Sequence, residues 1–221
     1  MKKFLVAVAA AMIFLPSVGF AAPSDITLPA PNLKGGKVTV MQALSQRKSS
    51  REFVERELNA AQMSKILYAA NGINREDGKR VNPAGMGVYC VEVYAVTKSG
   101  IYRYDPKNHK MILTAAGDYR KIAADGKDKP MKAAVNLVYV ENPSAWATME
   151  TAPDRDRQIF FADVMVGEMI QSVALAAEAE GLGGYVRGGV MRDDFKRVAN
   201  LSDDSRIILA QSVGYVAKEA K

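Results

Sequence analysis

The sequence is short of the side chains that most metal sites and hydrolytic enzymes use. Its 221 residues include one cysteine, Cys90, and one histidine, His109. A single cysteine excludes an internal disulfide, and this pair is too small a set for a zinc site or for Ser-His-Asp or Cys-His catalysis. Cys90 is expected to point into the core, and His109, in "DPKNHK", to be a solvated loop residue. Any chemistry is therefore expected to come from a bound cofactor.

Neither sign of charge is strongly in excess. The chain has 30 lysines and arginines against 24 acidic residues, a net charge of +6, and such a mild excess does not indicate nucleic-acid binding. Two of these charges, Lys2 and Lys3, precede the apolar run "FLVAVAAAMIFLPSVG". Residues 1–21 therefore predict a secretory signal peptide. We expect export to a periplasm and no membrane anchor after cleavage.

The rest of the chain predicts an α+β domain over residues 39–221, preceded by an extended arm at 22–38 that contains three prolines. Strands and helices alternate in a pattern typical of elements arranged around one sheet. Helices are predicted at 39–47, 59–71, 117–124, 155–180 and 192–199. Strands are predicted at 88–96, 100–105, 110–115, 133–140, 184–187 and 206–216.

Three of the predicted helices carry informative apolar faces. The 39–47 helix is expected to direct Met41 and Leu44 inward. The 59–71 helix begins at the cap Asn59 and ends before Gly72, and one face is expected to be buried: Met63, Ile66, Leu67 and Ala70. The 155–180 helix is apolar on more than one face, which indicates burial within a domain or between subunits.

The stretch "QRKSSREF" sets Arg47, Lys48 and Arg51 around two serines. In an extended backbone, residues two apart point the same way, so Arg47, Ser49 and Arg51 would converge while Lys48 and Ser50 face elsewhere. Arginine forks bind phosphate oxygens through charge-assisted hydrogen bonds. The stretch is therefore either a phosphate site or an ordinary solvated basic face.

Two glycine-containing stretches also have two interpretations. "EGLGGYVRGGV" at 180–190 holds five glycines, which is more than a helix cap needs and would let a planar ligand approach the backbone. It fits neither of the common phosphate-binding glycine motifs. "RVNPAGMGVYCVEVY" at 80–94 is a small-residue loop that leads into a strand, and it is either an ordinary loop or a ligand-facing one.

Five segments together resemble the nitroreductase family of FMN-dependent oxidoreductases. "RKSSREF" is similar to the family's Arg-Arg-Ser-x-Arg-x-Phe opening, and "LYAANGINREDGKRVNPAGMGVYCVEVYAV" to its Leu-x-x-Ala-x-Gly-x-Asn … Leu-Glu-Val-Tyr segment. "FADVMVGEMIQSVALAAEAEGLGGYVRGGV" resembles its long central helix with the glycines that follow, and "ILAQSVGYV" its last strand. The hairpin "GIYRYDPKNHKMIL" is similar to the branch that includes azoline-oxidising peptide dehydrogenases. The segments occur in order from about residue 26 to 216.

The resemblance implies a nitroreductase-like FMN-binding fold, with a mostly antiparallel central sheet flanked by helices, and a homodimer with FMN at the subunit interface. Matched position by position, it implies phosphate contacts from Arg47, Ser49 and Arg51, with Lys48 beside them. It implies that backbone N–H groups of Gly188 and Gly189 meet flavin N5 and O4. It implies that one loop lies along the isoalloxazine: Pro83, Ala84 and Gly85.

Three positions depart from the family pattern. Gly87 stands where the family often has an asparagine that binds the pyrimidine edge, so this contact is either lost or moved to Asn82. Cys90 and Val91 stand where Pro-Trp or Pro-Leu is usual. The family's second phosphate cation, near the C-terminus, can only be Lys218 or Lys221.

The expected activity is transfer of two electrons from a reduced donor to a nitroaromatic, quinone or related conjugated acceptor. The alternatives are a flavin-dependent dehydrogenase of a peptide or small metabolite, and a flavin-binding protein without turnover. NAD(P)H is an uncertain donor, because a periplasm is not expected to supply it. No side chain is assigned a catalytic role, since the flavin itself carries the chemistry.

Overall fold

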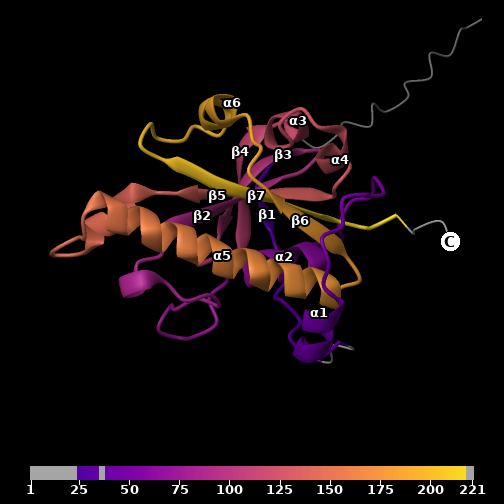
Figure 1. The fold of residues 1–221 in the computed structure, drawn as a ribbon, viewed down its shortest axis with the longest axis horizontal. Coiled ribbons are helices and arrows are strands. Elements are labelled where there is room, and N and C mark those ends of the chain that lie inside the picture. The colour runs from indigo at the N-terminus through magenta and orange to yellow at the C-terminus, as the bar shows by residue number, and fades with distance from the viewer. Residues whose placement is uncertain (1–23, 35–37, 218–221) are drawn as a thin grey trace, which may run out of the picture.

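A seven-stranded antiparallel sheet forms the centre of the protein in the computed structural model, which describes residues 24–34 and 38–217 (Figure 1). The strand order is β1-β4-β3-β2-β5-β7-β6, so β1 and β6 are the edges. Every neighbouring pair is antiparallel, as predicted. The strands are β1 (Ile26–Thr27), β2 (Val91–Val96), β3 (Gly100–Asp105), β4 (Lys110–Ala116), β5 (Val135–Glu141), β6 (Gly183–Arg187) and β7 (Arg206–Gly214).

Helices cover both faces of this sheet (Figure 1). One face carries α1 (Val40–Gln46), α2 (Ala60–Asn71) and α5 (Arg155–Ala179). The other carries α3 (Arg120–Ala123), α4 (Asp128–Met131) and α6 (Arg192–Val198). Every predicted helix and strand is present, with ends shifted by up to three residues. The short elements β1 and α4 and the 3-10 helices η1 (Gly85–Gly87) and η2 (Pro143–Thr148) are additions. The predicted signal peptide at 1–21 lies outside the described residues.

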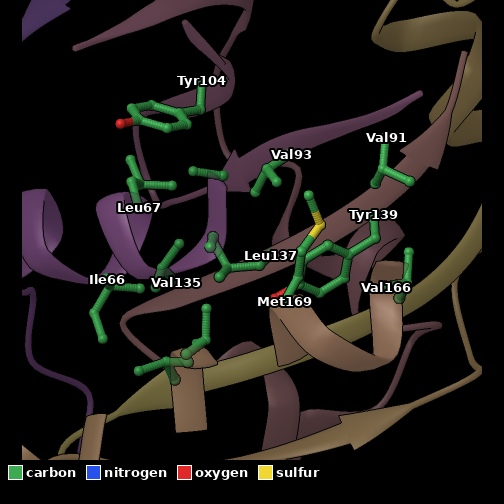
Figure 2. Close-up of a cluster of buried hydrophobic side chains, with 14 of the residues drawn as sticks. Ile66, Leu67, Val91, Val93, Tyr104, Val135, Leu137, Tyr139, Val166 and Met169 are labelled. Carbon is green, nitrogen blue, oxygen red and sulfur yellow. The ribbon is translucent and has the colours of Figure 1, made fainter. Parts of the chain in front are cut away.

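The larger core lies between the sheet and the helices α2 and α5. All seven residues of β5 are buried, and Figure 2 shows Leu137 and Tyr139 from this strand beside Met169 of α5. Ile66 and Leu67 of α2 complete the same cluster, so the predicted apolar face of this helix is confirmed. Burial of one such side chain contributes about 1.5–3 kcal/mol. The core therefore fixes α5 firmly against the sheet.

Helix α1 is present where predicted, but its orientation differs from the expectation. Thr39 and Gln42 form a capping box at its start, which stabilises a short helix by about 1 kcal/mol. Met41 and Leu44 were expected inward, yet their exposed fractions are 73% and 44%, and Ala43 is the buried residue. Successive residues are about 100° apart around a helix. Packing through the small Ala43 therefore turns both larger neighbours toward solvent.

Helix α5 is apolar on two sides. By length and composition alone it could cross a membrane, but one side is packed into the core: Ala162, Met165, Val166, Met169, Val173 and Ala177. The opposite side is exposed and includes Phe160, Val164 and Gly167. The prediction of more than one apolar face is confirmed. No described part of the same chain covers the second face.

The single cysteine is in the core, as expected, but the single histidine is not a solvated loop residue. Cys90 is 1% exposed, and burial raises its pKa to about 11. His109 is half-buried: Nε2 lies 2.8 Å from Ser64 Oγ and 3.1 Å from the Pro29 carbonyl oxygen, and Nδ1 lies 2.8 Å from the Tyr104 hydroxyl. The His109 ring joins the arm to α2 and β3. Local sequence patterns do not reveal these contacts, because the arm and α2 are far from His109 in the sequence.

A buried carboxylate joins three elements at one end of the sheet. Glu141, the last residue of β5, is fully buried, and its Oε2 lies 3.2 Å from Arg155 Nη2 and 2.7 Å from Arg206 Nε. Arg206 Nη2 also lies 2.7 Å from Asp163 Oδ1 on α5. Two guanidiniums offset the cost of removing this carboxylate from water. The ion network therefore locks β5, β7 and the start of α5 together.

We expect Glu141→Gln to lower the free energy of unfolding by about 3 kcal/mol, the lower end of the range for breaking a buried ion pair. The lower end applies because the side chains of Arg155 and Arg206 remain partly exposed and can be hydrated. Urea denaturation measures the change. Glu150→Gln, at an exposed position, is the control and should change stability by less than about 0.5 kcal/mol. Equal effects would contradict the role of Glu141.

Acidification should weaken the His109 tie. Burial lowers the pKa of His109 below its usual value of about 6.5, so below pH 6.5 the unfolded chain binds more protons than the folded one. Stability contributed by neutral His109 is therefore present above pH 6.5 and is lost as the pH falls. We expect the stability advantage of the wild type over His109→Gln to shrink between pH 7.5 and 5 in urea titrations. Parallel pH curves for the two proteins would refute this.

Candidate functional site

The basic stretch of the sequence lies along the edge strand β6. Ser49 forms a parallel bridge with Gly184, and the Ser50 N–H donates to the Gly184 carbonyl at 3.0 Å. A Cβ at Gly183 would lie 2.3 Å from Val216 Cγ2, and one at Gly184 would lie 2.6 Å from a backbone oxygen of β7. These two glycines are therefore required by the packing of the chain itself, and they need no ligand to explain them.

A pocket of about 130 Å³ opens between this stretch, β6 and the C-terminal half of α5. Arg47, Lys48 and Ser49 line it together, opposite Ala174 and Glu178 of α5. Among the described residues, Arg47 makes no ion pair with a carboxylate. Adjacent cations repel each other unless an anion lies between them. Glu178 lines the same pocket, so the anion-binding interpretation is favoured by Arg47 and not by the two cations together.

The alternation expected for this stretch holds only in part. Lys48 was expected to face away, yet it lines the pocket with its two neighbours. Arg51 was expected beside Arg47, but it is absent from the pocket lining, and its guanidinium carbon lies 5.2 Å from the centre of the Tyr185 ring. The reason is that Arg47 ends α1 and only Ser49 joins the strand. The backbone is therefore not uniformly extended.

The two glycines predicted to face a flavin follow the same strand, at its far end. Gly188 lies four residues beyond Gly184, which corresponds to about 13 Å along an extended strand. A Cβ at Gly188 would meet no atom within 4 Å, whereas one at Gly189 would lie 2.8 Å from Asp125 Oδ2. Gly188 therefore has an open face, and Gly189 is confined by a neighbouring turn.

Arg187 holds this glycine pair in place, a role that the sequence reasoning missed. Its Nη1 donates to the Gly189 carbonyl and its Nη2 donates to Asn136 Oδ1 at 2.8 Å. Ser212 Oγ donates to the same Asn136 oxygen at 2.7 Å. Burial lowers the pKa of Arg187, but an arginine remains charged. An arginine directly before a glycine pair at a strand end is the signal that could have indicated this clamp.

The predicted isoalloxazine loop forms a second, separate cluster. Pro83, Ala84 and Gly85 line a pocket of about 290 Å³ together with the N-terminal half of α5: Phe160, Phe161, Val164, Met165 and Glu168. Gly85 has a packing reason, because a Cβ there would lie 2.2 Å from Phe161 Cδ1. Gly87 has a φ of +75°, which favours glycine, and a Cβ there would meet nothing within 4 Å.

Asn82 does not replace the missing asparagine of the family pattern. Its side chain is 3% exposed, and Nδ2 donates to the carbonyls of Ala69 and Ala70 at 2.8 and 2.9 Å. Oδ1 accepts from the Ser172 hydroxyl. All of its polar atoms are thus engaged within the chain. Asn82 fastens the loop to the end of α2 and to α5, and it is not free to bind a ligand.

One chain does not bring the two clusters together. The first pocket lies beside Ala174 and the second beside Val164, and ten helical residues span about 15 Å. The predicted phosphate end and glycine pair share the edge strand β6, while the loop lies at the other half of α5. Lys218, the remaining predicted contact, lies outside the described residues, as does Lys221.

Comparison with known proteins gives a consistent result. The family model described as "Nitroreductase family" matches residues 44–215. A nitroreductase-like protein from Ralstonia eutropha is 32% identical, with a TM-score of 0.80, and the match covers 95% of this chain and 97% of that one. The Escherichia coli microcin synthetase McbBCD complex matches at 19% identity and a TM-score of 0.67, over 98% and 85%. A nitroreductase-like protein from Desulfovibrio desulfuricans in complex with FMN matches at 18% and 0.57, over 82% and 88%.

The two kinds of glycine should respond differently to an added methyl group. We expect Gly85→Ala to lower the free energy of unfolding by about 1–3 kcal/mol, because the Phe161 ring must move. Gly188→Ala, in open space, should change it by less than about 1 kcal/mol. Urea denaturation of both variants without added ligand is the measurement. Equal losses would mean that Gly188 is also confined by the chain.

Proposed function

The chain belongs to the nitroreductase family, and from this premise we propose that it binds FMN and transfers two electrons from a reduced donor to a nitroaromatic, quinone or related conjugated acceptor. The observation that carries the proposal is the arrangement along β6. A cation-lined pocket at Arg47–Ser49 lies at the start of this edge strand, and the open backbone of Gly188 lies at its end. An extended ligand with an anionic end fits this arrangement.

The phosphate end of FMN would be held by Arg47, Lys48 and the Ser49 hydroxyl. Charge-assisted hydrogen bonds of this kind contribute about 1.5–3 kcal/mol each. Arg51 would contribute mainly through its charge and through Tyr185, on which it stacks. The like charges that crowd this stretch are then stabilised by the doubly charged phosphate, which explains why the sequence places them together.

The ring end would be met by backbone groups and not by a titrating side chain. FMN, when bound, supplies the hydride chemistry. Arg187 donates to the Gly189 carbonyl and to Asn136 Oδ1, which restrains the backbone that directly follows the two glycine N–H groups. A preorganised backbone donor stabilises charge without reorganising during the reaction. Cys90 is in the core and His109 is engaged with the arm, so neither is available to the reaction.

We propose that the active form is a homodimer. The two clusters lie at opposite halves of α5, and the exposed side of that helix carries Phe160, Val164 and Gly167. Glycine within a helix costs about 1 kcal/mol relative to alanine, and a Cβ at Gly167 would meet no atom within 4 Å. Close approach of a second helix explains the glycine. A second copy would place the loop cluster of one subunit against the β6 cluster of the other.

Two further features of the proposal concern the setting. The leader at 1–21 supports export to a periplasm without a later membrane anchor, and the mild charge supports small-molecule substrates and not nucleic acid. The similarity to a microcin synthetase subunit complex keeps a flavin-dependent dehydrogenase of a peptide as the alternative activity. A flavin-binding protein without turnover is the remaining alternative. A turnover assay with a quinone, driven by a chemical reductant or by NAD(P)H, distinguishes an enzyme from such a flavin-binding protein.

The purified mature protein should be yellow and should release FMN on denaturation. We expect the double variant Arg47→Ala, Arg51→Ala to bind FMN about 10- to 10²-fold more weakly, since the charge-assisted contact of Arg47 contributes about 1.5–3 kcal/mol and Arg51 adds only its more distant charge. Arg47→Ala alone should account for the larger share, because only Arg47 lines the pocket. Fluorescence titration with FMN is the measurement. Arg197→Ala, on the exposed side of α6, is the control. A colourless protein that does not bind added FMN would refute the proposal.

A charge on the exposed side of α5 should separate the subunits. We expect Val164→Glu to convert a dimer to a monomer at low micromolar concentration, because a carboxylate would be buried against the second helix without a partner. Sedimentation velocity measures the mass, and circular dichroism checks the fold. Lys121→Glu on the opposite layer is the control and should remain dimeric. A well-folded wild-type monomer at the same concentration would exclude the dimer.

A further inference from the structure

The pocket at the N-terminal half of α5 has an unusual lining. Seven of its eight residues are apolar or glycine, and the eighth, Glu168, is the only ionisable one. The pocket has a volume of about 290 Å³, at the lower end of the range for small-molecule sites. A single carboxylate on an apolar wall gives such a pocket one charged contact. It therefore has a directional preference that purely apolar packing would not supply.

Glu168 has no partner among the described residues. It makes no hydrogen bond and no ion pair, although other carboxylates nearby are engaged, such as Asp163 with Arg206 at 2.7 Å. Burial raises the pKa of Glu168, because the apolar surroundings disfavour its charged form. A partly buried carboxylate without a donor is destabilised. A ligand that offers a donor or a positive charge would relieve this cost.

The walls around Glu168 are held in place by aromatic packing. The Phe161 ring lies against Gly85 on one side, and its centre is 6.0 Å from that of the Trp146 ring. Phe160 and Phe161 are 5.6 Å apart, centre to centre. The guanidinium carbon of Arg157 lies 6.0 Å from the centre of the Phe161 ring. Arg157 does not line the pocket, so Glu168 keeps its charge uncompensated there.

We propose that this pocket binds the electron acceptor and that Glu168 selects acceptors with a conjugated ring and a cationic or hydrogen-bond-donating substituent, against anionic ones. The inference rests on the proposed function, since the loop Pro83–Gly85 that lines the pocket is the loop assigned to the flavin. The ring would lie against Phe161 and the loop residues Pro83 and Ala84, which leaves Phe160 and Val164 for the proposed contact with the second subunit. The substituent would pair with the Glu168 carboxylate in a charge-assisted hydrogen bond. An anionic substituent would be repelled by the same carboxylate.

Binding of three matched probes tests the pocket independently of flavin. Benzamidine, benzamide and benzoate share a ring and differ in charge, so their dissociation constants from the FMN-free mature protein can be compared by ligand-observed NMR at low ionic strength. We expect benzamidine to bind at least tenfold more tightly than benzoate, which corresponds to about 1.4 kcal/mol, with benzamide between them. Glu168→Gln should remove this order. Equal binding of the three probes, or a preference that persists in Glu168→Gln, would overturn the inference.

A matched control distinguishes the local carboxylate from the general charge of the protein. Asp156→Asn removes one negative charge from the first turn of the same helix, away from the pocket, and should leave the probe order intact. If Asp156→Asn and Glu168→Gln have the same effect, Glu168 is not the selecting group. Circular dichroism and the unfolding midpoint confirm that both variants fold.

Kinetics then separate this inference from the proposed function. With FMN-loaded protein reduced by dithionite, the rate of flavin reoxidation is compared for 4-nitrobenzylamine, 4-nitrobenzyl alcohol and 4-nitrobenzoate. We expect the cation to exceed the anion by at least tenfold in second-order rate constant, and Glu168→Gln to reduce this ratio to about one. Reoxidation without a charge preference would refute the selection of acceptors by Glu168 and would leave the proposed function standing. Failure to bind FMN at all would refute the proposed function, while the probe titrations would still decide the pocket.

Discussion

The docking of residues 49–54 onto the ends of β6 and β7 is the constraint on which the rest of the site depends. Ser50 donates to Gly184, and the Val54 N–H donates to the Tyr215 carbonyl at 2.8 Å. This segment covers an edge strand that would otherwise present unpaired backbone groups. It also fixes the cations that precede it at one end of β6. The phosphate end and the glycine end of the proposed site are therefore set by one strand, and neither requires a flexible loop.

The glycines that follow α5 illustrate how one composition serves several purposes. Gly181 has a φ of +67° and ends the helix, while Gly183 and Gly184 admit the docked segment. Gly188 has open space at its Cβ position, as Gly181 does, but without the positive φ that would explain a glycine there. The number of glycines indicated a ligand site, but the individual positions show that most of them are required by the backbone conformation or packing of the chain itself. The partly buried Arg187 adds the rigidity that a glycine pair lacks, because its Nη1 donates to the Gly189 carbonyl.

The sequence predicted the elements well because they depend on local periodicity and on the length of apolar runs, whereas the antiparallel sheet was implied by the family resemblance. What it did not predict depends on contacts between distant segments. Met41 is exposed because α1 packs through Ala43, and His109 is tied to an arm residue 80 positions away. Arg51 is absent from the expected phosphate trio because the backbone between the end of α1 and Ser49 is not uniformly extended, and its guanidinium lies over the Tyr185 ring instead. In each case the residue type was compatible with both outcomes, and tertiary neighbours decided between them.

Helix α5 connects these observations, because each of its sides has a different task. Its core side is fixed by Met165, Met169 and their neighbours, and its start is locked by the ion network at Glu141. A helix held this firmly can present exposed apolar residues and an unpaired Glu168 without collapsing onto them. The two pockets lie at its two halves. In the proposed dimer, a two-fold axis would therefore place the β6 pocket of one subunit opposite the loop pocket of the other. The stability of the core thus supports the surface at which we propose that a second copy binds.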